Sequence, residues 1–259
     1  MIKPGLLLSR RQLLVNSAAL TLGGCDRLSQ APTFQRFLAA AEGLTYRAHR
    51  TLIGRGALAQ EYVEKDISKT FRANGSQDAY NLPPEYLELA SNGYAGWRLQ
   101  VGGLVIRPTG FSLADLRALD ARTQITRHDC VEGWSCIGRW TGPPLSAVLT
   151  RVGLRPEARY IVFHCADEVL HYLDGSNSYY ESIDLLDAFH PQTILAYEMN
   201  GAPLPLAYGA PLRLRVERQL GYKMAKFITR IEAVDRLDRI RGGRGGYWED
   251  SGYEWYAGI

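Results

Sequence analysis

The sequence lacks the motifs by which several common classes of redox and metal protein are recognised. It contains no C-x-x-C, no C-x-x-C-H and no H-E-x-x-H, so thioredoxin chemistry, covalent c-type haem and a zincin-type zinc site are all unsupported. It also lacks an apolar run of the roughly twenty residues that a membrane-spanning helix needs. No internal repeat or sharp linker divides it, which indicates one α+β domain with a mixed β-sheet.

A basic excess is also missing from most of the chain. Three of its basic residues, Lys3, Arg10 and Arg11, lie within the first 25 residues, which contain no Asp or Glu. The rest of the chain carries 27 basic residues against 27 acidic ones. Because a nucleic-acid-binding surface needs a basic excess, we expect no nucleic-acid partner.

Residues 1–25 have the pattern of an export signal. Arg10 and Arg11 precede the stretch LLVNSAALTLGG, which is too short to span a bilayer and is typical of a twin-arginine signal. The stretch ends in LGGC, which resembles a lipoprotein cleavage site with Cys25 as the lipidated residue. Asp26 resembles the signal that retains such lipoproteins at the inner membrane. We therefore expect a protein on the periplasmic side of that membrane, with cleavage further on, or an uncleaved anchor, as the alternatives.

The patterning divides the chain into four segments. A signal occupies residues 1–25, a tether and helical region 26–70, the main domain 71–241, and a Gly- and aromatic-rich tail 242–259. Within them, the spacing of apolar residues predicts a helix from residue 34 to about 64. Turn and cap residues predict hairpins around Gly102-Gly103 and at Asn200-Gly201, and a helix capped by Ser112. Alternation over TQITRHDC predicts a strand that ends at Cys130.

The cysteines leave several interpretations open. If Cys25 is lipidated, three remain, Cys130, Cys136 and Cys165, which is an odd number for a disulfide framework in an oxidising compartment. Cys130 is therefore a buried structural thiol, one half of a Cys130–Cys136 disulfide, or a metal ligand. The residues around it favour the last of these.

The segment HDCVEGWS, followed by W-x-G-x-P-L, resembles the molybdenum-site motif of the sulfite oxidase superfamily, especially its bacterial methionine-sulfoxide-reductase-like members. The resemblance extends from about Phe71 to Arg241. It implies a sulfite-oxidase-type molybdopterin-binding fold, with one molybdenum–molybdopterin per chain and the Cys130 thiolate on the metal. A thiolate is a soft, strongly donating ligand, which suits a redox-active metal.

The resemblance also implies further site residues. Tyr179 matches an active-site tyrosine, with the adjacent Tyr180 as the alternative register. Cys165 stands where relatives usually have threonine, and Tyr208 where they have Asn or His. Together with the metal ligand, the residues implied to bind the cofactor are Phe71, Arg72, Asn74, Cys130, Cys165, Tyr208, Arg213, Met224, Ala225 and Lys226. Arg213 and Lys226 would supply positive charge to the cofactor phosphate.

Several other polar and aromatic residues are expected to be structural. Arg215 alternates with Arg213 on a strand and is expected to be solvated without a role. His128 either donates a proton or supports the pocket, and Cys136 is expected in the core. Glu132 and Trp134 are expected to pack behind the metal. Structural roles are also expected for His164, His171, His190 and the aromatic tail, the last as a lid on the domain.

The expected activity is two-electron oxygen-atom transfer. Sulfite is a dianion and needs a strongly cationic pocket, yet only Arg127, with Arg139, is near Cys130 in the sequence. A neutral S- or N-oxide suits the aromatic wall that Trp134, Trp140, Tyr179 and Tyr180 would form, so reduction of a small-molecule oxide is favoured over oxidation of an oxyanion such as sulfite. A true sulfite oxidase and a non-catalytic binding lipoprotein are the alternatives.

The electron partner and the oligomeric state follow from motifs that the sequence lacks. Because there is no haem-attachment motif, another protein must supply electrons, and a membrane haem protein is the expected partner. Too few residues follow Arg241 for the dimerisation domain of vertebrate-type sulfite oxidases. We therefore expect a monomer.

Overall fold

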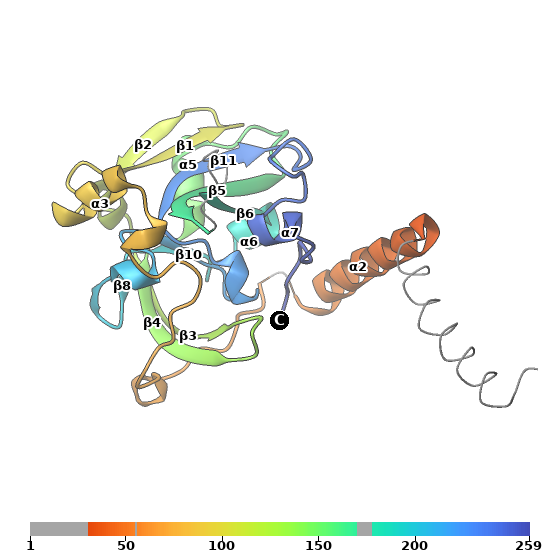
Figure 1. Cartoon of the computed structure of the whole chain (residues 1–259), viewed down its shortest axis with the longest axis horizontal. Helices are drawn as coiled ribbons and strands as arrows, with labels where there is room; N and C mark the ends of the chain where they lie inside the picture. The colour runs from red at the N-terminus through yellow and green to blue at the C-terminus, as the bar shows by residue number, and fades with distance from the viewer. Residues whose placement is uncertain (1–30, 55, 170–177) are drawn as a thin grey trace, which may run out of the picture. The chain divides into compact units, whose positions relative to one another are not determined.

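The computed structural model describes residues 31–54, 56–169 and 178–259 (Figure 1). The chain divides into two compact units, Met1–Leu52 and Ile53–Ile259. Within the described ranges, no helix is both long and apolar enough to cross a membrane. The expectations for Arg10, Arg11, Cys25 and His171 lie outside the described residues.

Helix α2 (Pro32–Leu52) makes up nearly all of the described part of the first unit. It is shorter than the predicted helix, because Gly54 and Gly56 follow it and glycine is a poor helix former. In the second unit the chain then runs in extended form along a β-hairpin. Tyr62 N–H donates to Ile125 O at 2.8 Å, and Ser68 N–H donates to Ile137 O at 3.0 Å.

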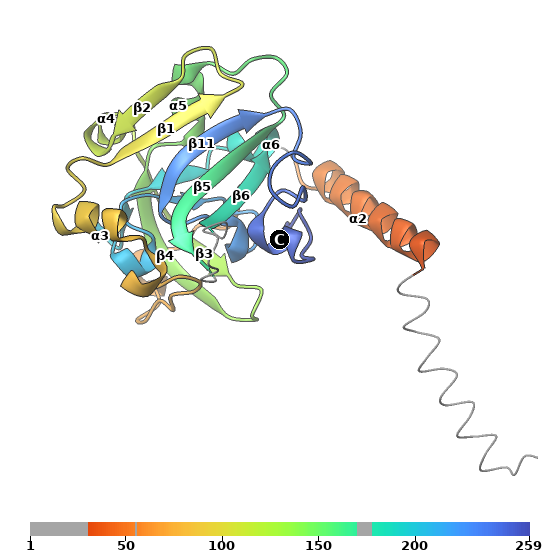
Figure 2. The same ribbon diagram turned by 45° about the horizontal axis from the view of Figure 1, so that its top comes forward.

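A five-stranded mixed sheet forms one side of the second unit, in the order β2–β1–β11–β5–β6 (Figure 2). β1 runs parallel to β11, and the other neighbouring pairs are antiparallel. The strands are β1 (Arg98–Gly103), β2 (Thr109–Ser112), β5 (Tyr160–Glu168), β6 (Ser178–Asp184) and β11 (Ile228–Val234).

The predicted first hairpin is confirmed: the last residue pair of β1 and β2 is Val101 opposite Thr109, so the connection begins at Gly102-Gly103. β1 continues through Gly103, and the chain returns as β2 with Arg98 opposite Ser112. A Cβ at Gly103 would lie 2.3 Å from Ala233 O of β11. The glycine therefore allows β1 and β11 to approach each other closely, and with φ of 77° it also begins the turn, since its carbonyl accepts from Val105 N–H at 2.8 Å.

Two smaller antiparallel sheets complete the second unit. One has the order β3–β4–β8–β9 and the other pairs β7 with β10. The strands are β3 (Arg122–Asp129), β4 (Ser135–Gly142), β7 (Ile194–Ala196), β8 (Glu198–Met199), β9 (Ala202–Pro203) and β10 (Arg213–Arg215). The predicted turn at Asn200-Gly201 is confirmed, with φ of 50° and 80° as a two-residue hairpin turn requires.

Short helices connect the strands. The predicted cap of α4 is confirmed, because Ser112 Oγ accepts from Asp115 N–H at 3.1 Å and Asp115 accepts from Ser112 N–H at 2.8 Å. The α-helices are α3 (Pro84–Ser91), α4 (Leu113–Arg117), α5 (Leu145–Val152), α6 (Leu185–Ala188) and α7 (Tyr247–Asp250). The 3-10 turns are η1 (Glu64–Asp66), η2 (Ala79–Asn81), η3 (Leu206–Tyr208) and η4 (Gly221–Lys223).

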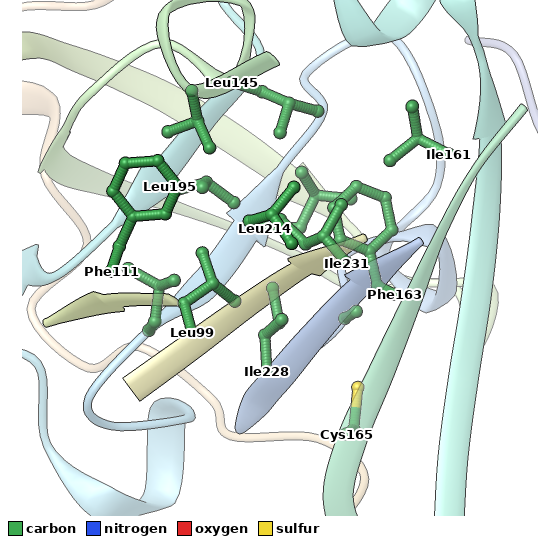
Figure 3. Packing of buried hydrophobic residues seen from close by; sticks show 14 of the residues in the cluster. Leu99, Phe111, Leu145, Ile161, Phe163, Cys165, Leu195, Leu214, Ile228 and Ile231 are labelled. Carbon is green, nitrogen blue, oxygen red and sulfur yellow. The ribbon is translucent and has the colours of Figure 1, made fainter. Parts of the chain in front are cut away.

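The main core is made of apolar residues from the five-stranded sheet, α5 and the β7–β10 pair (Figure 3). On α5 the buried positions Leu145, Val148, Leu149 and Val152 follow the helical i, i+3, i+4, i+7 spacing. Each fully buried aliphatic side chain contributes roughly 1.5–3 kcal/mol to stability. Figure 3 shows Cys165 on β5 beside this group.

A buried ion cluster fixes the C-terminal tail to the sheet. Lys223 Nζ of η4 donates to Glu181 of β6 and to Glu249 of α7, each at 2.5 Å, and all three side chains are fully buried. Burial removes each charged group from water. The free energy lost in this way is offset only while the oppositely charged partners stay in place. The cluster therefore fixes how β6, η4 and α7 meet.

We predict that Lys223→Met lowers the free energy of unfolding by about 3–5 kcal/mol, because it leaves two carboxylates buried without their cation. Urea denaturation followed by circular dichroism measures this change. As a control, Arg236→Ala removes an exposed ion pair with Asp238 and should leave the midpoint unchanged. Equal midpoints for both variants would show that the buried cluster contributes nothing.

Candidate active site

A cavity of about 210 Å³ opens at the C-terminal end of β3. It brings together five of the predicted site residues, which come from distant parts of the sequence. The described residues that line it are Asn74, Gly75, Ser76, Cys130, Val131, Glu132, Asp167, Val169, Tyr179, Gly221, Tyr222, Met224, Lys226, Trp248 and Tyr253.

The β3–β4 hairpin places Cys130 in this cavity. Cys130 follows the last residue of β3, and its N–H donates to Trp134 O at 2.9 Å. Gly133, with φ of +84°, closes the turn by donating to Cys130 O at 3.0 Å. Burial raises the pKa of the Cys130 thiol. The predicted strand end and the cavity therefore meet at a single thiol held by a tight turn.

The alternative of a Cys130–Cys136 disulfide is not what the structure shows, because all three cysteines in the described ranges are free. Cys136 lies on β4 opposite His128 of β3. Its sulfur accepts from Arg72 N–H at 3.4 Å and packs in a small core with Phe71 and Trp140. Cys136 is therefore a core residue, as predicted.

Polar groups line one part of the cavity. Lys226 Nζ donates to Asn74 O at 2.8 Å and to the carbonyls of Ser76 and Ala207. Ser76 Oγ donates to Asp167 Oδ2 at 2.7 Å, while Asp167 Oδ1 is buried without a partner among the described residues. Burial raises the pKa of Asp167 to about 6, and burial followed by the charge of Arg213 lowers the pKa of Lys226 to about 7.

Arg213 adds a second buried cation. It donates to Tyr208 O at 3.1 Å and to Met224 O at 3.4 Å, and its Nε lacks a partner among the described residues. Burial and then the charge of Arg215 lower the pKa of Arg213. Two cations, Arg213 and Lys226, are thus buried near each other, and neither forms an ion pair with another described residue.

The prediction that Arg215 is solvated is wrong. Arg215 is fully buried, makes a double hydrogen bond to Glu217 and donates to His128 Nδ1 at 3.0 Å. Trp140 lies against both Arg213 and Arg215, with ring centroids 4.9 and 4.4 Å from their guanidinium carbons. Leu214, on the opposite face of β10, is also fully buried, so both faces are covered and alternation along the strand does not place one side in water.

These residues fit the anionic cofactor that the resemblance implies. A buried positive group is stabilised by a charge-assisted hydrogen bond, and a phosphate ester offers several acceptors. Glu217 is already paired with Arg215, so a bound phosphate would supply the negative charge that Arg213 and Lys226 lack. Cys130 offers the soft ligand for the metal. No group of three or more His, Cys, Asp or Glu within the described ranges is placed to hold a metal ion.

The two adjacent tyrosines of β6 have different environments. Tyr179 lines the cavity, and its hydroxyl donates to Tyr222 O. Tyr180 points away, and its hydroxyl donates to Asp250. Because successive side chains of a strand point to opposite faces, only Tyr179 reaches the cavity. Tyr179 is also the tyrosine that the resemblance matched first, with Tyr180 as the alternative.

The remaining residues implied for the cofactor surround the cavity without lining it. Phe71 packs edge-on against Trp140 and Tyr208, and Tyr208 OH donates to Phe71 O at 2.7 Å. Arg72 is exposed over the Trp134 ring. Cys165 and Ala225 belong to the main core. Arg213 lies behind Met224, which itself lines the cavity.

The residues expected to be structural also have defined positions. His128 is fully buried between Arg215 and Met224, and burial followed by nearby cations lowers its pKa, so it is neutral. His164 contacts Glu232, and His190 contacts Ala57 O. Glu132 was expected to pack behind the metal, but it lines the cavity.

The aromatic wall is built from different residues than predicted. Of Trp134, Trp140, Tyr179 and Tyr180, only Tyr179 lines the cavity, and Trp140 is fully buried elsewhere. Tyr222, Trp248 and Tyr253 supply the rest of the wall. Sequence reasoning missed Trp248 and Tyr253 as site residues, since it assigned the whole tail to a lid.

Ser76 and Asp167 are further residues of the cavity that sequence reasoning missed. Both lie within two residues of positions that the resemblance did match, Asn74 and Cys165. An aspartate within the largely apolar strand β5 was the available signal, because a buried carboxylate needs a compensating partner or a function.

Comparisons with known proteins agree with this geometry. The family model for the oxidoreductase molybdopterin binding domain matches residues 87–239. The chain is 37% identical over 255 residues to the putative protein-methionine-sulfoxide reductase subunit YedZ1 of Azospira oryzae, across 96% of this chain and 88% of that protein. It is 36% identical over 147 residues to the protein-methionine-sulfoxide reductase catalytic subunit MsrP of Xanthomonas axonopodis pv. citri, across 54% of this chain and 46% of that protein.

Among solved structures, the sulfane dehydrogenase SoxCD of Paracoccus pantotrophus is similar over 56% of this chain and 40% of that chain, with a TM-score of 0.49 and 24% identity. The family model covers more than half of this chain, and the Azospira relative is matched across most of both sequences. The predicted resemblance is therefore confirmed. The chain belongs to the family of the oxidoreductase molybdopterin binding domain, within the sulfite oxidase superfamily, and is an oxidoreductase with the mixed α+β fold of that family.

Proposed function

We propose that this enzyme carries one molybdenum–molybdopterin and reduces neutral S- or N-oxides rather than oxidising sulfite. One observation carries the proposal: among the described residues, the cavity beside Cys130 is lined by four aromatic rings and by no arginine. An anion as strongly charged as sulfite needs concentrated positive potential, whereas an uncharged oxide suits an apolar wall with few polar groups.

The arginines nearest to Cys130 in the sequence are paired elsewhere, and Arg72, which is exposed, pairs with Glu132 at 3.6 Å. Arg127 pairs with Asp129 at 2.9 Å, and Arg139 pairs with Glu64. Lys226 is the cation that lines the cavity in the described ranges, and its ammonium already donates to three carbonyls. None of these groups is placed to receive a doubly charged substrate.

The reaction is balanced by two electrons and two protons. When bound, the cofactor would supply a metal that exchanges an oxygen atom and two electrons with the substrate. A sulfoxide then yields a thioether and one water. Cys130 would hold the metal, while Arg213 and Lys226 would hold the phosphate of the cofactor. Tyr179 keeps its proton, because burial raises its pKa, and donates it in a hydrogen bond to Tyr222 O.

The relatives support a sulfoxide as substrate. The Azospira and Xanthomonas proteins carry the name of protein-methionine-sulfoxide reductases, and the aromatic wall described above is consistent with a thioether product, because sulfur packs favourably against aromatic rings. We extend the proposal to the cellular setting. The enzyme would be a monomer exported by the twin-arginine route, tethered by lipid at Cys25 on the periplasmic side of the inner membrane, with a membrane haem protein as electron donor.

The substrate assignment is tested by steady-state assays of the molybdenum-loaded enzyme. With reduced viologen as donor, we expect turnover of methionine sulfoxide. With sulfite and an artificial electron acceptor, we expect little or none. Rapid sulfite turnover without reduction of the oxide would reverse the assignment and identify a sulfite oxidase.

A pair of cysteine variants tests the proposed ligand. Cys130→Ser should abolish activity and weaken molybdenum retention, since a hydroxyl is a harder and weaker ligand than a thiolate. Cys136→Ala, which alters a core thiol 9% exposed, should keep both largely intact. Activity and metal content measured on the same preparations decide this, and similar losses in the two variants would contradict the assignment.

Two further variants test export and tethering. Arg10→Lys with Arg11→Lys should block export of the folded holoprotein, because the paired arginines form the signal. Cys25→Ala should permit export but release the protein from the membrane, since bacterial lipoproteins are held by more than one acyl chain. Fractionation of periplasm and membrane measures both results. Soluble wild-type protein would rule out the lipid tether.

A further inference from the structure

We infer that the C-terminal segment 246–253 forms a substrate subsite, in which Trp248 and Tyr253 receive the alkyl side chain of methionine sulfoxide. The inference rests on the proposed function and deepens it. Both aromatic residues line the cavity that contains Cys130. Both lie beyond residues 87–239, the range matched by the family model.

Trp248 and Tyr253 form a continuous aromatic surface with Tyr222. The Trp248 and Tyr253 rings are stacked, with centroids 5.4 Å apart and an interplanar angle of 28°. The Tyr222 ring meets Tyr253 edge-on at 5.3 Å. Tyr253 remains 40% exposed although it is one of the larger apolar side chains. The stack thus presents an apolar face to the cavity and to solvent. Packing of the core does not require this exposure.

Packing around η4 places this surface next to Cys130. Gly221, which precedes Tyr222, lies so close to β3 that a Cβ there would be 2.4 Å from the His128 ring and 3.3 Å from Asp129 O. His128 and Asp129 are the two residues before Cys130. Tyr222 therefore connects the thiol end of the cavity to the aromatic pair.

The two residues that follow Trp248 hold it in place. Glu249 is bound to the buried ammonium of Lys223 at 2.5 Å. Asp250 accepts from Gly242 N–H at 3.1 Å, from Arg244 N–H at 3.0 Å and from Tyr180 OH. A short helix held at two consecutive residues positions its neighbouring side chain before substrate binds, which reduces the entropy lost on binding.

The chemistry of this surface selects the ligand. Lys226, which also lines the cavity, already donates to three carbonyls. Two stacked rings favour uncharged, polarizable groups, and thioether sulfur and its methylenes pack well on aromatic edges. Methionine sulfoxide carries such a chain beside its reducible oxygen. Dimethyl sulfoxide carries the same reducible group but lacks the methylene chain that the aromatic rings would receive.

The experiment compares kcat/KM for methionine sulfoxide with kcat/KM for dimethyl sulfoxide in one preparation of molybdenum-loaded enzyme, with reduced viologen as donor. This ratio does not depend on the fraction of folded or loaded protein. Trp248→Ala and Tyr253→Ala should each lower the ratio about tenfold, the factor that corresponds to about 1.4 kcal/mol. Trp248→Phe should restore most of it.

Tyr80→Ala provides the matched control, because Tyr80 is a 75% exposed aromatic residue that does not line the cavity. Its ratio should equal that of the wild type. If the wild type reduces both sulfoxides and both alanine variants keep the wild-type ratio, the subsite inference is overturned while the proposed function stands. Failure of the loaded wild type to reduce either sulfoxide would overturn the proposed function and the subsite together.

Discussion

The cavity depends on the turn η4 and on the buried ammonium that it carries. Lys223 is fully buried between Glu181 and Glu249, while the preceding Tyr222 accepts a hydrogen bond from Tyr179 and Gly221 packs against His128. Because an ion cluster of this kind repays its desolvation only in one arrangement, the turn fixes three segments at once. The end of β3, the cavity face of β6 and the tail therefore meet at one place.

The second constraint is buried positive charge that forms no ion pair with the described residues. Arg213 and Lys226 are buried, and each has a lowered pKa because burial and a neighbouring cation oppose its charged form. Such an arrangement costs folding free energy in the absence of an anion and makes an anion bind more tightly, since binding to the folded state stabilises it. Residues whose burial locally lowers the stability of the fold are typical of functional sites rather than of structural positions.

The sequence predicted the parts of the site that depend on neighbouring residues. A strand ending in a thiol, the cap at Ser112 and the turn at Asn200-Gly201 are set by residues a few positions apart, and short-range sterics and hydrogen bonding decide them. The prediction for Arg215 was wrong because its burial depends on residues far away in the sequence. Alternation along β10 shows that two side chains share a face, but only packing across the molecule shows that both faces of the strand are covered.

By itself the sequence therefore determined the family, because residue chemistry and order carry that information. The same information led to the proposals that Cys130 holds the metal and that Arg213 and Lys226 bind the phosphate. The tertiary structure alone decided which of Tyr179 and Tyr180 reaches the cavity, that Asp167 joins it, and that the tail contributes Trp248 and Tyr253. These outcomes depend on contacts between segments many residues apart. Such contacts are selected by the packing of the whole fold, and no local pattern specifies them.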